Sequence, residues 1–69
     1  MRFNVLERKG LNAMLSGAFK IELTDGTIVW RHEYKRRQFV PGKPQVAYDD
    51  YPLDKFGSIE EFAAAMNKK

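Results

Sequence analysis

Cysteine is absent from the 69 residues of this chain. Its absence excludes a disulfide framework, a thiolate zinc site, an iron–sulfur cluster and a cysteine nucleophile. No apolar run comes near the roughly 18 residues of a membrane-spanning helix, and charged residues follow Met1 too soon for a signal peptide. We therefore expect a cytoplasmic protein that has no membrane contact.

Side chains that commonly carry catalysis are also scarce. The two serines are Ser58, which is predicted to cap a helix, and Ser16, which lacks the flanking residues of a nucleophile elbow. The one histidine, His32, is predicted to be half-buried and hydrogen-bonded rather than a catalytic base. The acids of residues 49–54 do not match an EF-hand loop, and no glycine-rich phosphate loop is present. We predict that the protein is not an enzyme and holds no cofactor or metal.

The overall composition is that of a globular protein. Hydrophobic residues make up 43% of the chain, charged residues 30% and aromatic residues 13%, which excludes a disordered tail. A chain of this length buries about 60% of the surface that its unfolded form exposes, which leaves room for one small core. We predict a single globular domain over residues 1–69.

The charges are sorted along the chain. The net charge is +3, but residues 25–43 carry a local charge of +3 and residues 44–61 a local charge of −4. A partner therefore meets charged patches of opposite sign and not an average.

A β-hairpin is the clearest local signal. Asp25 and Gly26 stand between two alternating runs, which predicts strands over about residues 18–24 and 27–36 joined by a two-residue primed turn. Counting outward from that turn defines a core face that carries Phe19, Ile21, Leu23, Ile28, Trp30, His32 and Tyr34. The other face, which we expect to be solvated, carries Lys20, Glu22, Val29, Arg31 and Glu33.

The second strand must break, because as one extended run it would be longer than the domain is wide. The apolar alternation changes parity between Tyr34 and Phe39, so we expect a bulge or break near residues 35–37, with their basic side chains exposed. Proline and glycine in residues 40–43 then occupy the two central positions of a type II turn. A short third strand over about residues 45–48 returns along the second strand as an edge.

The C-terminal segment predicts a helix over about residues 59–67. Ser58 and Glu61 have the spacing of a capping box, and Ile59, Phe62, Ala63 and Met66 form one apolar stripe. We expect this stripe to pack on the sheet over Trp30 and Ile21. Residues 1–17 are ambiguous between a strand and a short helix, because they begin with an alternation and continue with helical spacing at Leu11, Met14, Leu15 and Ala18. The fold class is α+β, a small antiparallel meander packed by a C-terminal helix.

The candidate binding site is the basic and aromatic segment that ends the hairpin. Its members are Arg31, Tyr34, Lys35, Arg36, Arg37, Phe39 and Lys43. Nucleic acid would pair its phosphates with the charges and stack its bases on the rings. An acidic protein would use the arginines as bidentate anchors and the rings as hot spots. Basic residues at a strand end can also serve solubility alone, but an exposed Phe39 has no such use.

Between these partners, the small basic excess and the neighbouring acidic segment favour protein recognition. We therefore predict first a non-enzymatic, stoichiometric binding protein, an accessory or inhibitor-type modulator that docks on a larger protein with an acidic surface. Short accessory proteins of phages and mobile elements share this size and style. The second prediction is a small DNA- or RNA-binding protein that uses the same residues, and an unpaired edge strand would also allow a homodimer.

Overall fold

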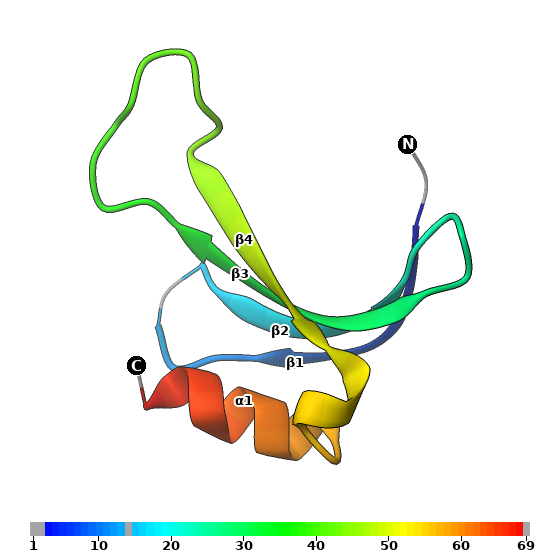
Figure 1. The fold of residues 1–69 in the computed structure, drawn as a ribbon. Helices are drawn as coiled ribbons and strands as arrows, with labels where there is room; N and C mark the ends of the chain where they lie inside the picture. The colour runs from blue at the N-terminus through cyan, green and yellow to red at the C-terminus, as the bar shows by residue number, and fades with distance from the viewer. Residues whose placement is uncertain (1–2, 14, 69) are drawn as a thin grey trace.

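The computed structural model describes residues 3–13 and 15–68, which form one antiparallel sheet and one packed helix. The strands follow one another across the sheet in chain order, as a meander (Figure 1). The elements are β1 (Asn4–Gly10), β2 (Gly17–Glu22), β3 (Ile28–Lys35), β4 (Val46–Pro52), the 3₁₀ turn η1 (Leu53–Lys55) and α1 (Ile59–Asn67). The predicted α+β class is confirmed.

Helix α1 begins at the predicted cap. The Ser58 hydroxyl accepts a hydrogen bond from the backbone N–H of Glu61 at 3.1 Å, and the Glu61 carboxylate accepts one from the N–H of Gly57 at 2.9 Å. Together they satisfy backbone donors at the helix start that would otherwise lack partners. The predicted apolar stripe is buried, and its members are Ile59, Phe62, Ala63 and Met66.

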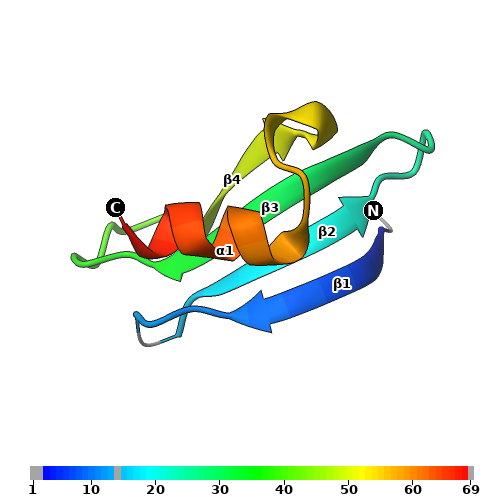
Figure 2. The ribbon, with the colours of Figure 1, turned by 90° about the horizontal axis from the view of Figure 1, so that it is seen from below.

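The core lies between this stripe and one face of the sheet, which α1 crosses (Figure 2). Trp30 is 2% exposed, and its ring centroid lies 5.6 Å from that of Phe62. The indole Nε1 donates a hydrogen bond to the Leu53 carbonyl oxygen at 2.8 Å, so the polar atom of the ring is satisfied inside the core. The rings of Tyr51 and Phe56 extend the cluster, 5.7 and 5.0 Å from Phe62.

The turn between β2 and β3 differs from the prediction. The backbone N–H of Gly26 bonds to the Leu23 carbonyl at 3.0 Å, and that of Leu23 to the Thr27 carbonyl at 2.7 Å, so the loop has three residues and not two. Gly26 has a positive φ of 88° but Asp25 does not, whereas the primed turn needs a positive φ at both residues. Asp25 instead accepts a hydrogen bond from the N–H of Thr27 at 2.9 Å, which lowers the pKa of its carboxyl below the ordinary value.

The longer loop shifts the hairpin register by one residue. Lys20 lies opposite Trp30, and Phe19 lies opposite Arg31. Because a one-residue slip moves the side chains of one strand to the other face of the sheet, the predicted grouping of Phe19 and Ile21 with Trp30 is wrong. The predicted grouping of Lys20 with Arg31 on one face is wrong for the same reason.

The corrected register defines two faces. Under α1, β2 contributes Ala18, which is fully buried, and Lys20, whose Nζ lies 5.6 Å from the Trp30 ring centroid and 3.6 Å from a Glu7 carboxylate oxygen. We call the opposite side of the sheet the helix-free face. Its side chains include Val5, Arg8, Phe19, Ile21, Val29, Arg31, Glu33, Lys35, Val46, Tyr48 and Asp50.

The flanking segments also refine the prediction. The third predicted strand is the edge strand β4, which is longer than expected because it continues through residues 49–52. The N-terminal segment begins with a strand, β1, and its register shifts between Val5 and Glu7 at a β-bulge. No helix forms among residues 11–13 and 15–16, because a connection this short cannot stabilise one; the predicted position at Met14 lies outside the described residues.

Candidate binding surface

Residues 36–45 connect β3 to β4 as a long loop that projects from the sheet, which we call the arm (Figure 1). Strand β3 ends at Lys35, within the region of residues 35–37 where the sequence predicts a bulge or break. Three hydrogen bonds close the base of the arm. The Arg36 N–H donates to the Gln45 carbonyl at 2.8 Å, the Gln45 amide donates to the Arg36 carbonyl at 2.9 Å, and Arg36 Nε donates to the Pro44 carbonyl at 2.8 Å.

The far end of the arm contains the predicted type II turn. Gly42 has a φ of 82°, and the Lys43 N–H donates to the Val40 carbonyl at 3.1 Å. Phe39 next to this turn is 76% exposed and Val40 is 38% exposed. Arg37 and Lys43 on either side are exposed as well. The arm thus presents an apolar tip between two cations.

Arg31 does not belong to the exposed cluster in which the sequence placed it. Its side chain is on the helix-free face, and the residue is 8% exposed. Arg31 Nε donates to Asp50 Oδ1 at 2.7 Å and Nη2 donates to Asp50 Oδ2 at 3.0 Å. This bidentate hydrogen bond raises the pKa of the guanidinium above its ordinary value, against the opposing effect of desolvation. The expectation of an exposed Arg31 is wrong, because β4 brings the acidic segment directly beside it.

Two aromatic rings complete the enclosure of Arg31. The guanidinium carbon lies 4.1 Å from the ring centroid of Tyr48 and 5.2 Å from that of Phe3. Both rings remain largely accessible, with Tyr48 56% exposed and Phe3 45% exposed. Cations over aromatic faces are attracted by the ring quadrupole, so this cluster fixes exposed rings in place on the helix-free face.

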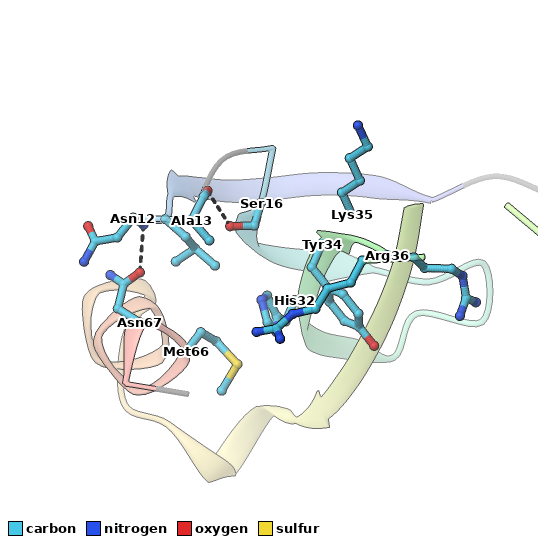
Figure 3. A pocket seen from close by; sticks show the side chains of 11 residues that line it. Asn12, Ala13, Ser16, His32, Tyr34, Lys35, Arg36, Met66 and Asn67 are labelled. Carbon is cyan, nitrogen blue, oxygen red and sulfur yellow. Dashed lines mark hydrogen bonds between the residues drawn. The ribbon is translucent and has the colours of Figure 1, made fainter. Parts of the chain in front are cut away.

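A pocket of about 350 Å³ lies at the base of the arm, on the side of α1 (Figure 3). Four of the predicted residues line it: Tyr34, Lys35, Arg36 and Arg37. Figure 3 shows that the Lys35 side chain points away from this pocket and that the Arg36 side chain runs away from it. The other lining residues include His32 and Met66, so the pocket wall is mixed, with polar and apolar side chains.

Tyr34 is held at this pocket by its neighbours. Its hydroxyl donates a hydrogen bond to Asp49 Oδ2 at 3.2 Å, and its ring centroid lies 5.0 Å from that of His32. Desolvation and the negative charge of Asp49 raise the pKa of the Tyr34 hydroxyl above its ordinary value. Tyr34 thus remains a neutral hydrogen-bond donor that joins β3 to β4.

The structure divides the seven predicted residues among three places. The arm carries Arg36, Arg37, Phe39 and Lys43, the pocket side carries Tyr34, and the helix-free face carries Arg31 and Lys35. Sequence reasoning missed the exposed rings of Phe3 and Tyr48. If the predicted third strand had been extended beyond residue 48, the alternation of Val46, Tyr48 and Asp50 would have placed Tyr48 on one face of the sheet.

In the described part of the chain, no three side chains of the metal-binding types gather closely enough to hold a metal ion. No helix among the same residues is long and apolar enough to cross a membrane. Comparison with known proteins found no matching family model, no significantly similar curated protein and no significantly similar solved structure.

Proposed function

We propose that this protein acts by stoichiometric binding, without catalysis, and that its arm docks on a larger protein with an acidic surface. The observation that carries the proposal is the 76% exposure of Phe39 at the tip of a loop whose base is closed by three hydrogen bonds. Burial of such a ring in a partner contributes about 1.5–3 kcal/mol. Aromatic side chains with flanking arginine are the usual hot spots of protein interfaces.

The distribution of charge supports a protein partner over a nucleic acid. Asp50 neutralises the charge of Arg31, so fewer cations are available to phosphates than the sequence suggests. Nucleic acid affinity grows with the number of phosphates that cations neutralise. A protein needs only a few anchors around an apolar contact, which Arg37 and Lys43 beside Phe39 provide.

The test places a photoactivatable benzophenone amino acid at position 39 and exposes the purified protein to a nuclease-treated extract of its source cells. We expect a protein to be crosslinked from position 39 but not from position 53, where Leu53 is an exposed apolar residue that follows the end of β4 opposite the arm. Phe39→Ala should weaken binding of that partner by about ten- to a hundredfold. Leu53→Ala is the matched control and should leave the affinity unchanged.

Two results would contradict the proposal. One is a Phe39→Ala variant that binds the crosslinked protein as tightly as the natural chain does. The other is retention on heparin together with binding to oligonucleotides that weakens steeply with salt, which would favour the nucleic acid alternative.

A further inference from the structure

The helix-free face continues the surface of the arm. Figure 1 shows the sheet curving away from α1, with the arm at one end and the turn between β2 and β3 at the other, so this face is concave. Four of its apolar side chains are about half exposed: Phe3, Val5, Val46 and Tyr48. An arm tip alone is small beside the roughly 800 Å² that each partner buries in a standard interface. The sheet face supplies the additional apolar area.

Charge is segregated between the two sides of the sheet. Of the nine acidic residues, all of which the structure describes, two are on the helix-free face. These are Asp50, whose charge is paired with Arg31, and Glu33, which is half-buried. The exposed cation Arg8 is on the edge strand β1, and the exposed cation Lys35 is at the end of β3 next to the arm, while the arm adds Arg37 and Lys43. The apolar centre therefore has a basic rim.

This distribution of charge determines the chemistry of the occupant. A second copy of the chain would bring a basic rim against a basic rim, which like-charge repulsion disfavours. A nucleic acid would satisfy the rim, but its phosphates would also meet the carboxylate of Glu33 on the interior strand β3. The rings of Phe3 and Tyr48 can stack on bases, but the aliphatic side chains of Val5 and Val46 offer them no stacking surface. A protein segment with apolar side chains flanked by carboxylates matches both the centre and the rim.

From these observations we infer that the helix-free face and the arm form one continuous site for an acidic protein segment that also carries apolar side chains. The inference rests on the proposed function and adds the sheet face as the main contact area. Phe3 and Tyr48, fixed against Arg31, are the central apolar contacts, and Arg8 and Lys35 pair with carboxylates of the segment.

The test uses a displayed library of random peptides as the probe and the purified full chain as the target. We expect the selected peptides to be enriched in Asp and Glu together with apolar residues. The double reversal Arg8→Glu/Lys35→Glu should weaken their binding at least tenfold, because two attractive contacts become repulsive. The control Lys55→Glu/Lys68→Glu makes the same change of charge at exposed positions off this face and should retain binding.

Circular dichroism checks that each variant is folded. Val46→Ser tests the helix-free face a second time without a change of charge. Peptides without an acidic excess, or peptides whose binding survives the Arg8→Glu/Lys35→Glu change, would overturn the inference. In that case Phe39→Ala distinguishes this inference from the proposed function. If Phe39→Ala alone weakens binding, the arm remains the docking site. If Phe39→Ala also leaves binding unchanged, both hypotheses are wrong. Preferential binding of oligothymidylate over the selected peptides would also overturn it.

Discussion

Trp30 and Arg31 are neighbours on β3, and both are nearly inaccessible, yet they are buried by different means. Trp30 is 2% exposed beneath α1, where apolar side chains surround its ring. Arg31 is 8% exposed on the helix-free face, where Asp50 pairs with it and the rings of Phe3 and Tyr48 flank it. One face of the sheet is therefore a core, and the other is a surface organised around a charge.

The difference shows how a two-layer domain can hold exposed apolar groups in defined positions. Under α1, burial is favourable because apolar surface leaves water, and the contacts are not directional. On the helix-free face, removal of a guanidinium from water is compensated only by a carboxylate in bidentate geometry. The pairing of Arg31 with Asp50 therefore fixes β3 against β4 at one register and keeps the ring of Tyr48 in place.

The largest expected effect tests the core side of the comparison. Trp30→Ala removes the ring that packs on Phe62 and should lower the free energy of unfolding by about 3–5 kcal/mol. That loss approaches the whole stability of a small domain. Urea denaturation followed by circular dichroism measures it, with Phe39→Ala as an exposed aromatic control that stays within about 0.5 kcal/mol. Cooperative unfolding of Trp30→Ala at the natural urea midpoint would mean that Trp30 is not the core anchor.

The next effect tests the helix-free side. Asp50→Ala leaves the Arg31 guanidinium inaccessible and without its carboxylate, which should lower the unfolding free energy by about 1–3 kcal/mol. Arg31→Met removes the charge as well. The double variant Asp50→Ala/Arg31→Met should therefore lose less unfolding free energy than the sum of the losses of the two single variants. A double-mutant cycle in urea measures this coupling. Strictly additive losses would show that the ion pair contributes nothing to the fold.

Local signals in the sequence predicted much of the fold. The cap at Ser58 and the stripe beginning at Ile59 fix α1 because each depends on residues within a few positions of one another. The type II turn at residues 40–43 is equally local, since proline and glycine set its dihedral angles. The burial of Trp30 followed from alternation together with its size.

The hairpin register could not be predicted, because Asp25 and Gly26 suit both a two-residue primed turn and the three-residue turn that forms. Both sides of β2 carry residues that can be buried: Ala18 fits closely under α1, and Ile21 is 1% exposed on the helix-free face. Alternation therefore could not decide which side faces the helix.

The candidate site was predicted only in part. The arm follows from the break after Lys35, a local feature. The enclosure of Arg31 depends on Asp50, 19 residues away in the sequence, and no local pattern specifies which β4 residue lies opposite it. The helix-free face was missed for the same reason, since its residues come from four strands whose registers had to be known.

A smaller effect tests the turn that sets which residues lie on which face. Gly26→Ala places a side chain at a φ of 88°, which should lower the unfolding free energy by about 1–2 kcal/mol. No atom lies within 4 Å of the added Cβ, so the loss would come from backbone strain alone. Gly26→Asn is the matched control and should recover part of the stability, because asparagine tolerates this conformation. Equal stability of the alanine and glycine forms in urea would contradict the positive φ at position 26.

The smallest expected effect concerns Tyr34, which links β3 to β4 on the α1 side as Arg31 does on the other. Desolvation, then the charge of Asp49, raises the pKa of the hydroxyl above its ordinary value. Asp49→Asn removes the charge but not the desolvation, so the pKa should fall part of the way back.

The phenolate absorbance at high pH measures this pKa, with Tyr34→Phe to assign the transition and Asp54→Asn as a control that should leave it unchanged. Because the native pKa lies above the unfolded value of about 10, the native state binds the proton more tightly, and the associated stability is present below pH 10 and lost as pH rises through the native pKa. Asp49→Asn should therefore reduce this loss at high pH. A Tyr34 pKa that does not move in Asp49→Asn would show that the charge of Asp49 does not raise it.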